Sequence, residues 1–161
     1  MDAIRRCRAD EHAAMVEIIN EAAQKYRGVI PDDCWHEPYM PAAELAGEVA
    51  AGVVFWGIEA GGKLAGIMGV QDRGEVELIR HAYVRPGAQG RSIGGRLLRH
   101  LCDRGERPVL VGTWAAADWA IGFYQRHGFS LLDRAEAAAL LARYWTVSDR
   151  QAEVSVVLAN R

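Results

Sequence analysis

A helix that begins with glycines and arginines is the part of this sequence best suited to bind an anion. Residues 83–101 read YVRPGAQGRSIGGRLLRHL and pass from an apolar strand through a turn into an amphipathic helix. The first backbone N–H groups of a helix lack partners inside it, and the helix dipole leaves about half a positive charge there. Because Gly90, Gly94 and Gly95 carry no side chains, a bulky anion can reach those N–H groups.

The charge of this region also favours an anionic ligand. Between Arg80 and Arg104 there are six arginines and one acid, Asp103, although the whole chain has a net charge of −2. A basic patch on an otherwise acidic protein attracts anions. The glycines fit neither the GxxxxGK(S/T) phosphate loop nor the GxGxxG motif, which argues against a kinase or dehydrogenase type of nucleotide site. The alternative is that the glycines only allow close helix packing and that the arginines form a solvated face.

The same stretch resembles the cofactor motif R/Q-x-x-G-x-G/A of the GNAT superfamily of acetyl-CoA-dependent N-acetyltransferases. It maps onto residues 89–94, with Ser92 where the family has its central glycine. A second likeness is ADWAIGFYQRHGF, residues 117–129, which is similar to the family's helix beside the pantetheine arm. Ala117 replaces an asparagine that is common before that helix. The resemblance is specific over about residues 75–132 and only architectural elsewhere.

This resemblance implies that the cofactor is acetyl-CoA. The strand backbone before the motif would pair with pantetheine, because its amides can extend a sheet edge. The N–H groups of residues 90–95 would hold the pyrophosphate. The cofactor-binding residues implied in this way are Ala82, Tyr83, Val84, Gln89, Gly90, Arg91, Ser92, Ile93, Gly94, Gly95, Phe123 and Tyr124.

Acetyl transfer to an amine needs a neutral nucleophile, a stabilised oxyanion and a proton for the departing thiolate. The resemblance implies that Tyr124 stands near the thioester sulfur, where its hydroxyl can supply that proton. The alternative is that Tyr124 is an aromatic residue of the core.

The general base stays open. Many relatives have a glutamate where this chain has Arg80, and arginine cannot accept a proton at ordinary pH. Strand alternation predicts that Glu77 and His81 are neighbours on one face, with His81 as the base or Glu77 acting through water. Each is equally interpreted as a structural hydrogen-bonding residue. An amine that arrives neutral, or a chain of waters, is a further alternative.

Specificity is expected in residues 26–40, YRGVIPDDCWHEPYM, which follow the first helix and should cover the acceptor side. Acidic side chains there can attract a cationic amine, and aromatic rings can wall its pocket. The alternative is a packed loop with its acids in water. The candidate substrate-binding residues are Asp32, Asp33, Trp35, Glu37 and Tyr39.

The elements that must position these residues occur in a mixed order. Patterning predicts an α/β (α+β) fold in which helices flank one mixed, mostly antiparallel sheet with a parallel crossover, as in GNAT acyltransferases. Helices are expected after an Asp10 cap through residue 26, over 42–52, in the motif, and over 117–127 and 134–145. Strands are expected over 4–8, 53–59, 64–72, 75–84, 108–114 and 152–159.

Composition sets the remaining expectations. Half of the 161 residues are apolar and a quarter are charged, which is typical of one globular domain, here 1–161. No signal-like start or membrane-length apolar run occurs, so we expect a cytoplasmic protein with no membrane or nucleic-acid partner. The three cysteines have no disulfide-frame or metal-ligand spacing. The expected function is N-acetylation of a small-molecule or exposed protein amine; the alternative is a non-catalytic acyl-CoA-binding or sensing domain. Whether the chain forms a homodimer is left open.

Overall fold

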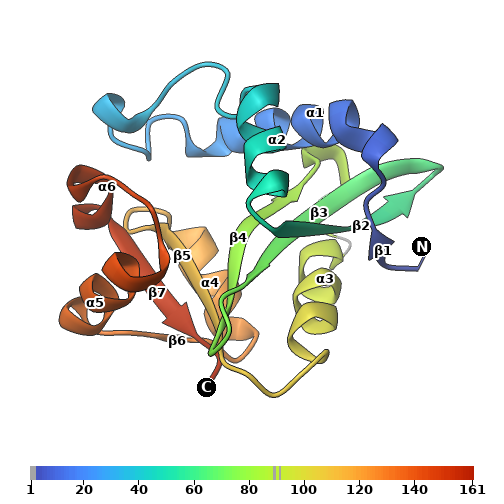
Figure 1. The fold of residues 1–161 in the computed structure, drawn as a ribbon. Coiled ribbons are helices and arrows are strands. Elements are labelled where there is room, and N and C mark those ends of the chain that lie inside the picture. The colour runs from blue at the N-terminus through green and yellow to red at the C-terminus, as the bar shows by residue number, and fades with distance from the viewer. Residues whose placement is uncertain (1–2, 89, 91) are drawn as a thin grey trace.

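In a computed structural model that describes residues 3–88, 90 and 92–161, one seven-stranded sheet is flanked by helices (Figure 1). The strand order is β1-β2-β3-β4-β5-β7-β6, and β4 with β5 is a parallel pair within an otherwise antiparallel sheet. The predicted fold class and parallel crossover are thus confirmed. The strands are β1 Arg5–Arg6, β2 Val53–Ala60, β3 Lys63–Asp72, β4 Glu77–Val84, β5 Val109–Trp114, β6 Ser130–Leu131 and β7 Ser155–Ala159.

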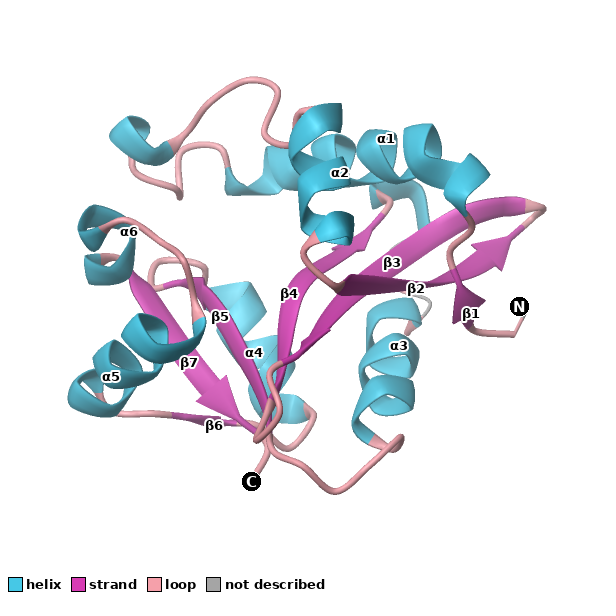
Figure 2. Ribbon diagram, viewed as in Figure 1, coloured by secondary structure: helices cyan, strands magenta, loops and turns pink. Residues whose placement is uncertain are grey.

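The helices cover both faces of the sheet. They are α1 His12–Ala23, α2 Ala42–Ala50, α3 Ile93–Cys102, α4 Asp118–Arg126, α5 Arg134–Tyr144 and α6 Asp149–Glu153. Figure 2 shows α1 and α2 on one face of β2, β3 and β4, and α3 on the other face. Ile18 and Ile19 of α1 pack with Ile67 on the first face, whereas Leu97 of α3 packs with Met68 on the second.

Local capping explains where the sequence prediction differs from the structure. Asp10 does not cap α1, because a 3-10 turn, Ala9–Glu11, precedes that helix. The last strand begins at Ser155 instead of residue 152, because α6 occupies the preceding residues. The Ser148 hydroxyl accepts a hydrogen bond from the backbone N–H of Gln151 at 3.1 Å, which satisfies a donor at the start of α6.

A bulge in β4 changes which residues share a face. Gly69 of β3 pairs with His81 and Val70 with Ile79, so Arg80 is an extra residue in β4. An extra residue reverses the alternation beyond it. Ile79 packs in the core beneath α3, whereas His81 stacks on Phe55 at 5.5 Å. The prediction that Glu77 and His81 are neighbours on one face is therefore wrong.

The same region is where the sheet opens. The register of β4 with β5 runs from Glu77 opposite Val109 to Ile79 opposite Val111 and ends there. Beyond this point the two strands separate, and Figure 1 shows the sheet divided into two wings. The C-terminal halves of β4 and β5 therefore face an opening rather than each other.

We expect Gly66→Ala to destabilise the protein by about 1–3 kcal/mol, the usual cost of overpacking. Gly66 lies in β3 under α3, and an added Cβ would lie 2.7 Å from Cγ2 of Ile93. The measurement is urea unfolding. The matched control is Gly47→Ala in α2, where a Cβ meets open space and alanine favours the helix. Equal stabilities of Gly66→Ala and the unsubstituted protein would contradict the close seating of α3 on β3.

Candidate active site

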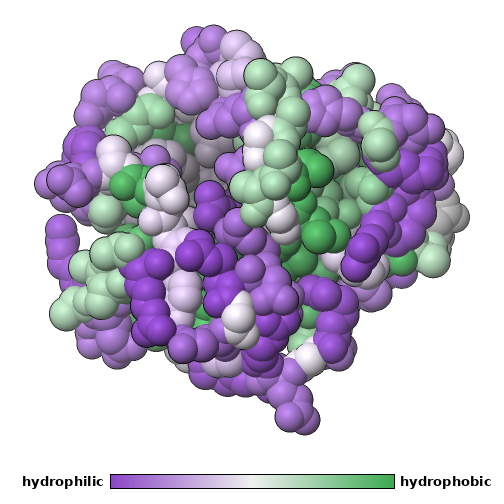
Figure 3. All heavy atoms as spheres, in the orientation of Figure 1, coloured by the Kyte–Doolittle hydropathy of each residue, from purple (hydrophilic) through white to green (hydrophobic). Residues whose placement is uncertain are grey.

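Two cavities meet where β4 and β5 separate. The larger, about 520 Å³, lies between β4, the start of α3 and α4. The smaller, about 270 Å³, lies between α2, β5, the residues after α5 and α6. Tyr26, Ala82, Tyr83 and Tyr124 line both cavities. The space-filling view shows the surface hollowed between α2 and α6, over the smaller cavity (Figure 3).

The larger cavity collects the residues that the sequence associates with the cofactor. Residues 82–84 of β4, Gly90, and residues 92–95 at the start of α3 all line it, as do Phe123 and Tyr124 of α4. Gln89 and Arg91 lie outside the described residues. The described part of the predicted set therefore surrounds one space, which the first turn of α3 borders.

The glycines of this turn serve two different purposes. Gly90 has a φ of +83°, which allows a turn that most residues avoid. An added Cβ at Gly90 would meet none of the described residues within 4 Å. A Cβ on Gly94 would lie 3.3 Å from Cζ of Phe123, and one on Gly95 would lie 2.6 Å from Nε2 of His127. Gly94 and Gly95 thus let α3 pack closely on α4, which agrees with the packing alternative for those two positions.

Ser92 adopts a backbone geometry that favours glycine. Its φ of 59° and ψ of 23° place it in the left-handed region, directly before α3. A side chain in this region costs about 1–2 kcal/mol. The backbone carbonyl of Ser92 accepts the hydrogen bond from the N–H of Arg96 at 3.0 Å, so the helix begins despite this strain.

The positive charge at the larger cavity comes partly from residues that sequence reasoning missed. Lys25, Arg99 and Arg126 line it, and of these only Arg99 belongs to the predicted basic patch. Lys25 follows α1, and Nζ lies 4.9 Å from the ring centre of Trp119 in α4. Neither Lys25 nor Arg126 belongs to the glycine motif, so only the fold brings them there.

Three arginines of the predicted basic patch are held by acids instead. Arg85 lies 2.7 Å from Glu17, and Arg104 lies 3.0 Å from Glu77. Arg80 lies 3.8 Å from the carboxylate of Glu48, which lines the smaller cavity. The patch is therefore smaller than the sequence indicates.

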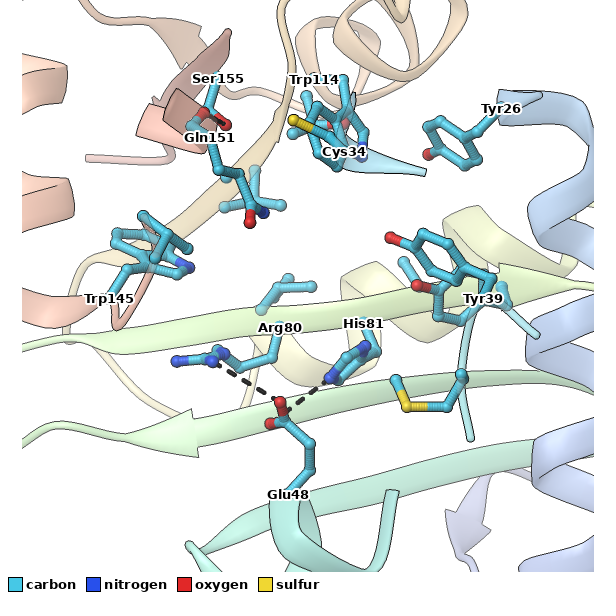
Figure 4. A pocket seen from close by; sticks show the side chains of 18 of the residues that line it. Tyr26, Cys34, Tyr39, Glu48, Arg80, His81, Trp114, Trp145, Gln151 and Ser155 are labelled. Atoms are coloured by element: carbon cyan, nitrogen blue, oxygen red, sulfur yellow. Dashed lines mark hydrogen bonds and ion pairs between the residues drawn. The ribbon is translucent and has the colours of Figure 1, made fainter. Parts of the chain in front are cut away.

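Aromatic side chains form much of the wall of the smaller cavity. Tyr39, Trp114 and Trp145 line it, and Figure 4 shows Trp145 and Tyr39 on opposite sides of the space. Burial raises the pKa of Tyr39, against the effect of interactions with the side chains of Tyr83 and Trp114. The Tyr39 hydroxyl is therefore neutral at ordinary pH.

Glu48 of α2 lies between two side chains of β4 at this cavity. One carboxylate oxygen, Oε1, is 3.8 Å from Nη2 of Arg80, and the other, Oε2, is 3.5 Å from Nε2 of His81 (Figure 4). These neighbours, His81 first, hold the pKa of Glu48 below its usual value. Sequence reasoning missed Glu48. Its only signal was the spacing from Glu44, which puts both carboxylates on one helix face.

The predicted catalytic residues do not all reach the site. Tyr124 is 5% exposed and lines both cavities, and burial raises its pKa far above the usual value. His81 lines the smaller cavity. Glu77 lines neither, because its carboxylate lies 3.0 Å from Arg104 and 3.5 Å from Arg107. Glu77 holds the end of α3 to the sheet rather than facing the site.

Of the predicted substrate-binding residues, Tyr39 lines the smaller cavity and the other four do not. Trp35 stacks on Tyr39 with ring centres 5.5 Å apart. Asp32 is exposed and lines neither cavity; the carboxylate of Asp33 is 2.8 Å from Arg150, and that of Glu37 is 3.6 Å from Arg27. Asp33 and Glu37 are thus paired with arginines and Asp32 is exposed to solvent, so none of the three faces the cavity.

Neither a cluster of metal ligands nor a membrane-spanning helix is found in the part of the chain that the structure describes. Within it, no three His, Cys, Asp or Glu side chains gather as metal ligands would. Within the same residues, none of the helices has the length and apolar character needed to cross a membrane.

Comparisons with known proteins agree with this geometry. The PaiA N-acetyltransferase from Thermoplasma acidophilum, crystallised with coenzyme A, matches with a TM-score of 0.74 at 17% identity, over 100% of this chain and 99% of that one. The ribosomal-protein-S18-alanine N-acetyltransferase from Escherichia coli matches with a TM-score of 0.72 at 20% identity, over 99% and 92%. N-acetylglutamate synthase from Neisseria gonorrhoeae, complexed with coenzyme A and N-acetyl-glutamate, has a TM-score of 0.65 at 19% identity, over 99% of this chain and 34% of that one.

These structural matches show a shared fold. A search among curated proteins found no match. The family model of the acetyltransferase (GNAT) domain matches residues 51–131, half of the chain, and this range includes the opening of the sheet and the start of α3. The chain therefore belongs to the GNAT acetyltransferase family.

Proposed function

We propose that this protein transfers an acetyl group from acetyl-CoA directly to the amine of a small molecule or an exposed protein amine. The observation that carries the proposal is the junction of the two cavities at Ala82, Tyr83 and Tyr124. A thioester in the larger cavity and an amine in the smaller one can meet there without passing through solvent. Holding two reactants together in this way supplies much of the rate enhancement of a bimolecular reaction.

The hydrogen-bond donors and positive charges that line the larger cavity suit coenzyme A. N–H groups at the start of α3 are available to a diphosphate, and Lys25 and Arg126 add positive charge beside it. Residues 82 and 83 lie beyond the end of the β4–β5 register, so their backbone can meet an extended amide chain there. When bound, acetyl-CoA supplies the activated carbonyl group, and every other contribution comes from the protein.

Tyr124 is proposed as the residue that provides a proton to the departing sulfur. Its hydroxyl is held neutral by burial, because no charge is favoured in that environment. A neutral phenol has a proton to donate at neutral pH. Its position on both cavities supports this role, because the thioester would lie where the two cavities meet.

We expect Tyr124→Phe to lower kcat by a hundredfold or more, as loss of a general acid does, with little change in the dissociation constant of coenzyme A. Phenylalanine keeps the ring that packs 5.7 Å from Phe129, so the fold should be retained. The measurements are turnover at saturating substrates and calorimetric titration with coenzyme A. Unchanged turnover would remove the hydroxyl from the mechanism.

We expect Ser92→Gly to stabilise the protein by about 0.5–1 kcal/mol and to leave coenzyme A affinity equal or higher. The substitution relieves the strain of a side chain on a left-handed backbone, which costs about 1–2 kcal/mol. Glycine offsets part of this gain, because it loses more conformational entropy on folding. Thermal unfolding with and without coenzyme A is the measurement. Ser92→Ala is the control, because it removes the hydroxyl and keeps the Cβ. If alanine stabilised as much as glycine, the strain argument would be wrong.

The function itself is tested by incubating the protein with acetyl-CoA and a panel of amines while free thiol is measured. We expect thiol release that depends on one class of amine. Tight binding of coenzyme A without release on any amine would favour a sensing domain instead. Stabilisation by ATP or NAD but not by coenzyme A would contradict both.

A further inference from the structure

Glu48 brings a carboxylate to the place where β4 has an arginine. The sequence lacks an acid at position 80, yet the carboxylate of Glu48 reaches Arg80 and His81 from α2. These three side chains come from two elements that are far apart in the sequence. Figure 4 shows them together at one edge of the smaller cavity, with Glu48 pointing to both partners.

Burial separates the roles of Glu48 and His81. The side chain of His81 is 10% exposed, and both of its ring nitrogens are buried without a hydrogen-bond partner among residues 3–88, 90 and 92–161. The Glu48 side chain is 21% exposed. An acceptor entering the cavity therefore reaches the carboxylate of Glu48 more readily than either ring nitrogen of His81.

A buried imidazole whose nitrogens make no hydrogen bond destabilises the fold unless a nearby charged group or a ligand interacts with them. Around His81 the described groups that can carry or share charge are Glu48 of α2, Arg80 and Tyr83 of β4, whereas Phe55 of β2 stacks on its ring. Tyr83 is buried, and burial raises its pKa well above the usual value, so it stays neutral. Glu48 is therefore the neighbour that can stabilise a proton on His81.

Glu48 alone is a poor final proton acceptor. Its neighbours keep its pKa low, so the carboxylate is ionised at neutral pH and attracts an ammonium group. The same low pKa means that it releases a proton readily. Imidazole is the side chain that holds a proton near neutral pH, and it stands 3.5 Å behind the carboxylate.

We propose that Glu48 and His81 act as a proton-accepting pair, in which Glu48 binds the acceptor as an ammonium ion and passes its proton to His81. The acceptor class is then a primary aliphatic amine that is protonated at neutral pH. This inference rests on the proposed acetyltransferase function. It makes Glu48 the catalytic residue that touches the amine, and His81 a positioning and relay residue behind it.

The proton transfer balances within these groups. One N–H bond of the ammonium breaks, and the proton moves to Oε2 of Glu48 and then to Nε2 of His81. The nitrogen keeps the electron pair and becomes the neutral nucleophile. Glu48 regains its negative charge, which stabilises the imidazolium until the proton returns through the more exposed Glu48 carboxylate to solvent.

The test compares Glu48→Gln, His81→Gln and Glu44→Gln. Glu44 also lines the cavity, one turn earlier on α2, so its substitution removes the same charge without touching His81. For each protein, kcat/KM is measured from pH 6 to 10 with an aliphatic amine and with an aromatic amine that is neutral at pH 7. Coenzyme A binding is measured in parallel to show that the larger cavity is intact.

At pH 7 we expect Glu48→Gln to lower kcat/KM for the aliphatic amine by a hundredfold or more. The defect should shrink by about tenfold per pH unit as the free amine forms in solution, and it should be small with the aromatic amine. His81→Gln should show the same pattern, whereas Glu44→Gln should change KM without a dependence on pH. NMR titration should show a lower pKa for the His81 ring in Glu48→Gln than in Glu44→Gln, independently of activity.

The outcomes separate the two levels of the proposal. A Glu48→Gln defect that is the same at all pH values and with both amines, or an unchanged His81 titration, would overturn the proton-accepting pair and leave the acetyltransferase function standing. Coenzyme A binding by the unsubstituted protein without thiol release on any amine would overturn the function and the pair together.

Discussion

The separation of β4 from β5 is the constraint on which the site depends. Two parallel strands can stay paired only while their registers agree, and the extra residue Arg80 disrupts β4 immediately after Ile79, where its pairing with β5 ends. The opening exposes backbone and side chains of both strands to two cavities at once. A sheet that stayed closed to its end would leave no junction at which a thioester and an amine could meet.

The position of α3 depends on three close approaches. Gly66 lets the helix lie on β3, and Gly94 and Gly95 let it lie against α4, where Phe123 and His127 occupy the space. A helix terminus binds an anion usefully only if it is fixed, because a mobile dipole loses its advantage to solvent. The glycines of the motif thus position the N-terminus as well as clearing it.

The sequence could predict which residues gather around the larger cavity, because their signals are local. The glycine motif and the start of α3 are contiguous, and the helix containing Tyr124 follows at a fixed distance. The acceptor side was not predictable in the same way. Its residues come from α2, the end of β5 and the segment around Trp145, and no short motif relates them.

The prediction from strand alternation also failed in β4, at Arg80. Counting by twos along β4 put Glu77 beside His81, and a bulge at Arg80 cannot be detected from such a pattern. Glu48 occurs in an alanine-rich helix to which sequence reasoning assigned no functional residue. The identity of the acidic partner became visible only when the fold brought α2 over β4.

Two segments that line the smaller cavity are joined at the surface by the contact between Asp33 and Arg150. Asp33 lies in the segment that contributes Cys34 and His36 to the cavity, and Arg150 lies in α6 beside Gln151. Both partners are exposed, so dissolved ions weaken their attraction. The contact that joins these two segments is thus one that salt weakens, whereas the aromatic stacking of Trp35 on Tyr39 depends on packing. Under the proposed function, the size of the amines that the smaller cavity admits would therefore depend partly on ionic strength.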